Sequence, residues 1–269
     1  MATQIVRTSD NAEISVDIAG EGPPIVFLHG WAMTSSYWSA QLHHFQSGFQ
    51  VIAPNFRGHG ASSDVAYGHR IARYAKDILE IIEALAPGQP FAMVGWSMGA
   101  SVALAFCDLF PDRAPSHLVL VDQTPCLLNG HDWSGGMPGL TRETMNETVD
   151  AVRNDFAGFL DGFLPNMFVS PPDLEELKRW RNESLALSSA SAATILADHI
   201  SQDWRDVIAG VSVPTLAIAG GDFLPIVGMK HIPAINPNIR LEVMTGQRHC
   251  PFLESAPEFN SLLSLFFSE

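Results

Sequence analysis

The segment FAMVGWSMGASVALAF, residues 91–106, decides how this chain folds. It contains GWSMG at residues 95–99, which matches the pattern G-x-S-x-G and stands between an apolar run and a run of small and apolar residues. Glycines on either side of Ser97 relieve crowding where a strand turns sharply into a helix. The sequence therefore predicts a strand at Phe91–Gly95, a helix at Met98–Phe110, and a serine hydroxyl that projects from the strained turn between them.

Short apolar runs alternate with longer stretches of helical period over most of the chain. This alternation is typical of a mostly parallel sheet that is covered by helices on both faces. Arg73–Leu85 and Ala256–Phe267 carry apolar residues at helical spacing, so we expect both to cover the sheet. Six further apolar runs, each bounded by Gly, Pro or polar turn residues, are predicted strands: Ala12–Ile18, Pro24–Leu28, Gln50–Pro54, His117–Asp122, Pro214–Ala219 and Arg240–Met244.

Residues 126–206 break this alternation for about eighty residues. The segment is too long for a single loop and is rich in aromatic and helical stretches. We interpret it as a helical cap inserted into an α/β core that consists of residues 1–125 and 207–269. Its larger apolar side chains could wall a substrate cavity: Trp133, Met137, Phe156, Phe159, Phe163, Met167, Phe168 and Trp180.

Composition narrows the possible classes of protein. With 46% hydrophobic and 16% charged residues, the chain of 269 residues can bury a large core and is predicted to be globular. The net charge of -14 argues against nucleic acid or an anionic membrane as a partner. No apolar run approaches the ~20 residues that span a bilayer and no signal-peptide pattern opens the sequence, so the protein is expected to be cytoplasmic. The three cysteines lack the spacing of a disulfide framework or a zinc site, and no metal is predicted.

A serine nucleophile needs a base within hydrogen-bond reach, and histidine has a pKa suited to that role. Ten histidines compete for it. His249 follows the last predicted strand through the turn at residues 245–248 and precedes the C-terminal helix, which places it late in the chain order Ser, acid, His. We predict that His249 is the base for Ser97.

Four motifs together resemble the α/β-hydrolase superfamily in order and spacing. They are LHGW at residues 28–31, PNFRGHG at 54–60, GWSMG at 95–99 and GQRH at 246–249. The resemblance covers nearly the whole chain outside the cap and implies the α/β-hydrolase fold, with a mostly parallel eight-stranded sheet, but it says little about the substrate. It is nearest to the esterase and cofactor-free haloperoxidase branches. The second motif also resembles cofactor-independent 2,4-dioxygenases, which open N-heteroaromatic rings.

This resemblance also implies which groups surround the nucleophile. In such enzymes an oxyanion is held by the N–H after the nucleophile and by an N–H of the loop after the third strand, here the backbones of Met98 and Trp31. The side chains of Trp96, His29 and Met33 are expected at the substrate pocket.

The acid is where the sequence departs from the common pattern. The family usually has an Asp three residues past a glycine after the penultimate strand, but Gly220 is followed at that spacing by Phe223, and Asp222 comes one residue early. The other candidate is Asp122, at the end of the strand beside the nucleophile's strand. A minority of the superfamily, the 2,4-dioxygenases included, resembles this placement. We predict Asp122 as the acid that orients His249, with Asp222 as the alternative.

These features predict a serine hydrolase of the carboxylesterase type that cleaves a carboxylic ester, a lactone or a related acyl compound through an acyl-Ser97 intermediate. We expect a moderately apolar small-molecule substrate and no cofactor, while the oligomeric state is left open. The alternative is a cofactor-independent 2,4-dioxygenase, in which His249 and its Asp would deprotonate a quinolone-type ring. Those dioxygenases resemble one another in an extra histidine at the position of Met33. A binding protein without activity is a third reading, against which the intact Ser97 and His249 argue.

Overall fold

The computed structural model describes residues 2–269, and a single eight-stranded sheet forms its centre. The strand order is β1-β2-β4-β3-β5-β6-β7-β8. β1 (Ala2–Arg7) pairs antiparallel with β2 (Glu13–Ala19), β2 pairs antiparallel with β4, and all other neighbours are parallel. The remaining strands are β3 (Pro24–Leu28), β4 (Gln50–Pro54), β5 (Ala92–Trp96), β6 (His117–Val121), β7 (Thr215–Gly220) and β8 (Ile239–Met244).

The central strands are apolar along their whole length because helices cover both faces of the sheet. Every residue of β3, β5 and β7 is buried, as expected for parallel strands with no solvent-facing side. The seven strands predicted from the sequence are confirmed, each to within one residue at either end. β1 was not predicted, because only Val6 of this edge strand is buried and its sequence carries no apolar pattern.

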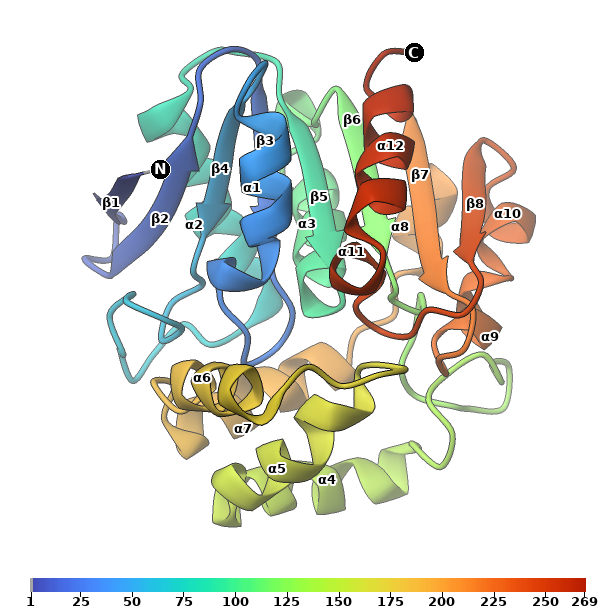
Figure 1. The fold of residues 1–269 in the computed structure, drawn as a ribbon. Coiled ribbons are helices and arrows are strands. Elements are labelled where there is room, and N and C mark those ends of the chain that lie inside the picture. Colours follow the sequence, from blue (N-terminus) through green and yellow to red (C-terminus); the bar gives the residue numbers. More distant parts are fainter. Residues whose placement is uncertain (1) are drawn as a thin grey trace.

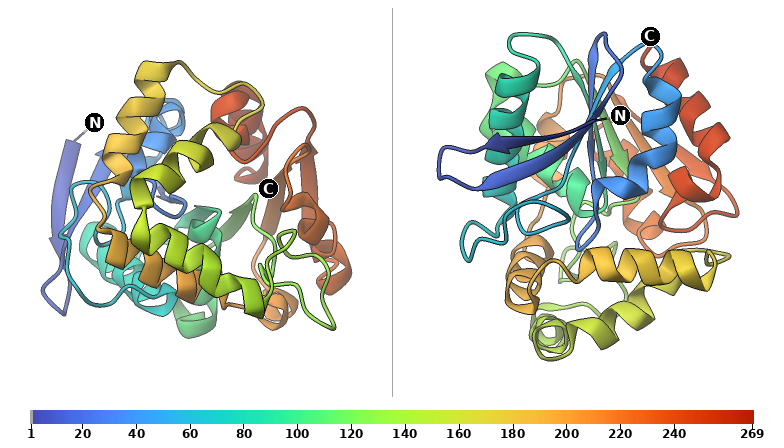
Figure 2. Two further views of the ribbon diagram at one scale, coloured as in Figure 1. Left: turned by 90° about the horizontal axis from the view of Figure 1, so that it is seen from below. Right: turned by 60° about the vertical axis from the view of Figure 1, so that its left-hand side comes forward.

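Two layers of helices enclose the sheet, as Figure 1 and the right-hand view of Figure 2 show. α1 (Ser39–Phe45) and α12 (Ala256–Phe266) lie on one face, and α2 (Ile71–Leu85), α3 (Met98–Leu109) and α8 (Arg205–Gly210) lie on the other. The three predicted core helices are therefore confirmed. Shorter turns of helix complete the core: Ser35–Trp38, Pro111–Arg113, α9 (Ile226–Met229), α10 (Ile232–Ile235) and α11 (Pro251–Glu254). Within residues 2–269, no helix has the length and apolar character needed to cross a bilayer.

The predicted helical insert is also confirmed, and it lies beyond the carboxyl ends of the parallel strands (Figures 1 and 2). It consists of α4 (Arg142–Asn154), α5 (Phe156–Asn166), α6 (Leu174–Ser184) and α7 (Ser189–Ile200). The chain leaves and re-enters the core side by side: Cys126 and Asp203 form an isolated β-bridge, and the N–H of Trp204 donates to the carbonyl of Pro125 at 2.9 Å. The division into residues 1–125, 126–206 and 207–269 stays a prediction.

The helices of the insert carry their own N-terminal caps. A side-chain oxygen of Thr141, Asp155, Asp173 or Ser188 accepts an N–H in the first turn of α4, α5, α6 or α7, respectively. Such a cap stabilises a helix by about 1 kcal/mol. In contrast, α2, α3 and α12 have no side-chain cap. The core helices thus depend on burial, whereas the insert helices depend more on local hydrogen bonds.

Candidate active site

Ser97 occupies the sharp turn that the GWSMG motif predicts. It lies between β5 and α3 with φ 53° and ψ −122°, in a region that costs a non-glycine residue about 1–3 kcal/mol. Its N–H donates to the carbonyl of Val121 on the neighbouring strand at 2.9 Å, which fixes the turn. A Cβ at Gly99 would collide with the carbonyl oxygen of Leu28, and one at Gly95 with that of Gly99. Close backbone packing therefore requires both glycines.

Asp122 stands in a second strained turn, directly after β6, and it holds His249. Its φ is 47° and its side chain is completely buried. Nδ1–H of His249 donates to Oδ2 of Asp122 at 2.6 Å, and the N–H of Gly220 donates to Oδ1 at 2.9 Å. Because both carboxylate oxygens are engaged, the carboxylate has one orientation. The imidazole is then held as the Nδ1–H tautomer, with Nε2 as its free nitrogen.

Asp222, the alternative acid, does not contact His249. Its side chain is exposed, and its backbone N–H donates to the carbonyl of Gln247 at 3.0 Å. Phe223, at the position where the acid usually lies, instead packs its ring against the imidazole of His249 with 4.8 Å between ring centroids. Of the two carboxylates that the sequence offered, Asp122 is the one brought to the histidine.

A cavity of about 250 Å³ opens beside Ser97 and His249. Most of its wall is apolar and comes from the insert and from the loops after the strands: Trp31, Leu127, Met137, Leu140, Phe159, Phe163, Leu196, Ile200, Phe223 and Pro225. The polar side chains that line it are Ser97, Gln123, Thr148, His199 and His249, and no Asp, Glu, Lys or Arg of residues 2–269 takes part. Both Ser97 and His249 line this cavity, although no hydrogen bond joins their side chains in the structure of residues 2–269. Such catalytic bonds often form only when substrate is bound.

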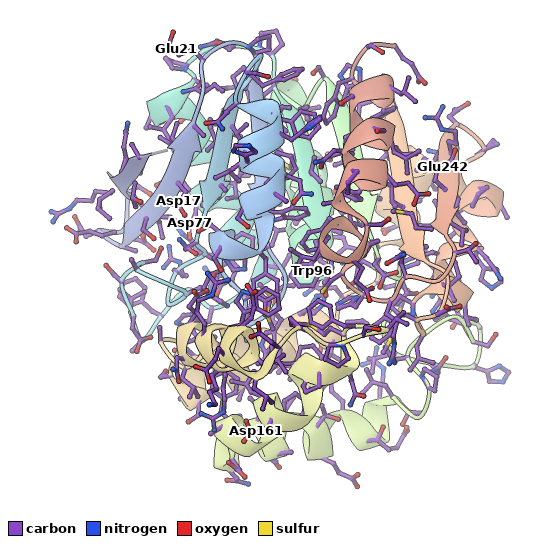
Figure 3. The ribbon with its side chains drawn as sticks, in the orientation of Figure 1. Asp17, Glu21, Asp77, Trp96, Asp161 and Glu242 are labelled. Atoms are coloured by element: carbon purple, nitrogen blue, oxygen red, sulfur yellow. The ribbon has the colours of Figure 1, made fainter. Side chains whose placement is uncertain are left out.

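The three side chains predicted at the substrate pocket do not line this cavity, and their role in substrate binding stays a prediction. Trp96, His29 and Met33 are all buried, and none of them forms part of the cavity wall. Trp96, which is labelled in Figure 3, is the last residue of β5, and its indole N–H donates to the carbonyl of His249 at 2.7 Å. Both ring nitrogens of His29 form hydrogen bonds with the backbone. Nε2 accepts the N–H of Phe56 at 3.0 Å, and Nδ1 donates to the carbonyl of Gly30 at 2.8 Å.

The backbone of Trp31 and Met98 offers two N–H donors near Ser97. Met98 is the first residue of α3, so its N–H has no partner inside the helix. The Trp31 loop passes close to the nucleophile, because a Cβ at Gly30 would lie 3.3 Å from Cβ of Ser97. In the described part of the chain neither N–H has a protein acceptor. The indole N–H of Trp31 donates to the carbonyl of Ala192 in α7 at 3.0 Å, which ties this loop to the insert.

Three polar residues of the cavity were missed from the sequence: Gln123, Thr148 and His199. Gln123 follows Asp122, and its side-chain amide donates to the carbonyl of Thr124 at 3.0 Å. His199 comes from α7, and burial lowers its pKa to about 3, so its ring is neutral at ordinary pH. The sequence carried one signal for it, since Leu196, His199 and Ile200 fall on one face of a helix.

The PNFRGHG motif at residues 54–60 lies apart from the cavity and supports the fold. Arg57 is completely buried and pairs with Asp77 at 2.7 Å and with Asp10 at 3.1 Å. Nδ1 of His59 lies 3.0 Å from the carbonyl oxygen of Arg57, and burial lowers the pKa of this ring to about 4. None of these side chains lines the cavity in the described structure. Residues 2–269 also contain no group of three or more His, Cys, Asp or Glu side chains that could hold a metal ion.

The arrangement of a serine turn, an Asp–His pair and a helical insert has counterparts among known proteins. The Alpha/beta hydrolase family matches residues 25–262. The chain belongs to this family. The resemblance seen in its four motifs is thereby confirmed, and so is the predicted fold class.

The relatives of this α/β hydrolase include esterases. It is 28% identical over 260 residues to a pimeloyl-acyl-carrier protein methyl ester esterase of Nitrosomonas europaea, an alignment that covers 93% of this chain and 98% of that protein. Two solved structures share its fold over 100% of both chains with a TM-score of 0.91: an esterase from Exiguobacterium antarcticum at 24% identity and a bromoperoxidase from Bacillus anthracis at 23%. This chain is therefore an α/β hydrolase that is similar in sequence to known esterases.

Proposed function

We propose that this α/β hydrolase is a carboxylesterase that cleaves a small, uncharged, mostly apolar ester or lactone through an acyl-Ser97 intermediate. One observation carries the proposal: the buried Asp122–His249 pair and the strained Ser97 meet at one apolar cavity. A neutral imidazole whose Nδ1–H is held by a carboxylate is equipped to accept a proton at Nε2. A charged substrate would lose its hydration in a cavity without an opposite charge to replace it.

The reaction follows from these positions. Nε2 of His249 takes the proton of Ser97 Oγ while Oγ bonds to the carbonyl carbon, and the resulting oxyanion accepts the N–H groups of Trp31 and Met98. The imidazolium then protonates the leaving alcohol oxygen as the C–O bond breaks. Water attacks the acyl-enzyme in the same way and releases the acid, which restores Ser97. Throughout, Asp122 stabilises the positive ring of His249.

The relatives and the cavity support the same class of substrate. The relative from Nitrosomonas europaea is a methyl ester esterase, which acts on an ester with a small alcohol part. The cavity of about 250 Å³ lies below the ~300–1,000 Å³ of typical ligand pockets. We therefore infer that the substrate, or the part of it that enters the cavity, is small.

The test combines turnover with covalent labelling of the serine. Purified protein is assayed with short and medium p-nitrophenyl esters and lactones, and a fluorophosphonate probe is located by mass spectrometry. We expect turnover and a label on Ser97, and loss of both in Ser97→Ala. The matched control is Ser101→Ala, because Ser101 lies buried on α3 without a hydrogen-bond partner, and this variant should keep both. Turnover in Ser97→Ala within about tenfold of wild type would falsify nucleophilic catalysis by Ser97.

The placement of Asp122 after β6 favours one second candidate, the cofactor-independent 2,4-dioxygenase. In that reaction His249 would remove a proton from a hydroxyquinolone ring, whose anion then reacts with O₂, and Ser97 would only position the ring. Oxygen uptake with an alkylhydroxyquinolone distinguishes the two. Uptake that survives in Ser97→Ala, without ester turnover in wild type, would replace the esterase proposal.

A further inference from the structure

His199 is a polar side chain in the mostly apolar wall of the cavity. It belongs to α7 of the insert, is 5% exposed, and lines the same cavity as Ser97 and His249. Burial lowers the pKa of His199, and the nearby ring of His249 lowers it further. The mechanism proposed above assigns it no role.

Neither ring nitrogen of His199 has a hydrogen-bond partner among residues 2–269. Nδ1 is completely enclosed, so Nε2 is the nitrogen that a molecule in the cavity can reach. A neutral imidazole carries one N–H and one lone pair. An enclosed N–H without an acceptor is rarer in proteins than an enclosed acceptor without a donor, which favours the proton on Nε2. His199 thus presents an unused donor to the cavity.

We propose that Nε2–H of His199 binds a second carbonyl or ether oxygen of the substrate, at a distance from the bond that is broken. This inference rests on the proposed esterase function and names its substrate class: an uncharged ester or lactone with one further oxygen acceptor on an otherwise apolar acyl part. A carboxylate is excluded as that acceptor, because a neutral imidazole and a wall without Lys or Arg cannot replace its hydration. The cap would then select substrates by one hydrogen bond.

The experiment uses p-nitrophenyl esters of one acyl length in which a ketone replaces a methylene at successive positions. For each ester kcat/KM is divided by that of the unsubstituted ester, in wild type and in His199→Phe. Intrinsic reactivity is the same for both proteins, so it cancels when the two ratios are compared. We expect one ketone position at which the wild-type ratio exceeds that of His199→Phe by about tenfold, as for loss of one hydrogen bond.

Two further variants serve as a partial rescue and as a control for the substitution. His199→Gln can place an amide N–H near the position of Nε2 and should recover part of the preference, also if His199→Phe folds poorly. His43→Phe makes the same substitution at an exposed histidine of α1 and should behave as wild type.

Equal ratios in wild type and in both His199 variants at every position would overturn the role of His199 and leave the esterase proposal standing. If wild type hydrolyses no ester of the series and Ser97 takes no fluorophosphonate label, the esterase proposal fails and the inference fails with it.

Discussion

The carboxyl edge of the sheet and the helical insert face each other across the cavity, and they are built in different ways. At the sheet edge three non-glycine residues adopt positive φ: Ala32 at 60°, Ser97 at 53° and Asp122 at 47°. Strain of this kind persists only where the surroundings impose it, here strands that are buried over all or nearly all of their length. The insert shows no such positions among its non-glycine residues, and its helices begin at ordinary side-chain caps.

This difference matches the roles that the proposed mechanism assigns to the two regions. Catalytic groups must be held within a fraction of an ångström, which rigid strand ends provide. The insert supplies most of the apolar wall and the proposed substrate donor His199, so it can change without disturbing the chemistry. The two regions are joined at α6, where Glu183 accepts the hydroxyls of Thr34 at 2.7 Å and Ser36 at 2.6 Å, and where Trp180 stacks on Tyr37 with 4.5 Å between ring centroids.

The largest expected effect is at the sheet edge. Ser97→Ala and His249→Ala should each lower kcat for a p-nitrophenyl ester by roughly 10⁶-fold, because a nucleophile and its base act as one unit. The double variant should be no slower than either single variant. A double variant slowed by the product of the two effects would show that His249 acts independently of Ser97.

The next largest effect is a loss of stability at acid pH, to which a buried histidine in each region contributes. The buried rings of His59 in the core and His199 in the insert have pKa values lowered by burial from about 6.5 to about 4 and about 3, respectively. Below pH 6.5 these rings are protonated in the unfolded chain but stay neutral in the folded chain. Their contribution to stability is therefore fully present above pH 6.5 and is lost as the pH falls toward the pKa values of the folded state. Between pH 7 and pH 5 each ring should lower the free energy of unfolding by about 2 kcal/mol.

Urea unfolding at the two pH values measures this loss. His199→Phe removes the contribution of His199 and keeps that of His59. The free energy of unfolding of this variant should therefore fall by about 2 kcal/mol less than that of wild type between pH 7 and pH 5. Identical losses in both proteins would show that His199 is not held neutral in the folded state.

The smallest effect on catalysis should come from the joint between the regions. Glu183→Gln weakens two charge-assisted hydrogen bonds and should lower the free energy of unfolding by about 2 kcal/mol, while KM rises more than kcat falls because the cavity wall moves and the Asp–His pair does not. Thermal melts and ester kinetics measure both. Glu175→Gln is the control, because Glu175 is 83% exposed on the same helix and its loss should cost less than about 0.5 kcal/mol. An equal effect of both substitutions would argue against Glu183 as the joint.

The sequence predicted the sheet well because buried parallel strands are continuous apolar runs. It did not predict β1, since that strand is held by pairing with β2 and buries little of its own surface. Ser97 and His249 could be found because local turns carry them. The cavity wall could not, because it depends on where α5 and α7 settle over the sheet: His199 lies about a hundred residues from Ser97 in the chain. Trp96, His29 and Met33 adjoin the site in sequence, yet they are buried and do not line the cavity.

The choice of acid tests the central claim most directly, namely that catalysis depends on the strained edge of the sheet and that Asp122 orients His249. The measurement is kcat/KM for one p-nitrophenyl ester in Asp122→Asn and Asp222→Asn, with folding checked by thermal melts. Loss of the carboxylate that holds the histidine tautomer should cost roughly 10⁴-fold in Asp122→Asn, whereas Asp222→Asn, a change at an exposed loop, should stay within about twofold of wild type. A larger loss in Asp222→Asn than in Asp122→Asn would contradict the account and move the acid to the loop after β7.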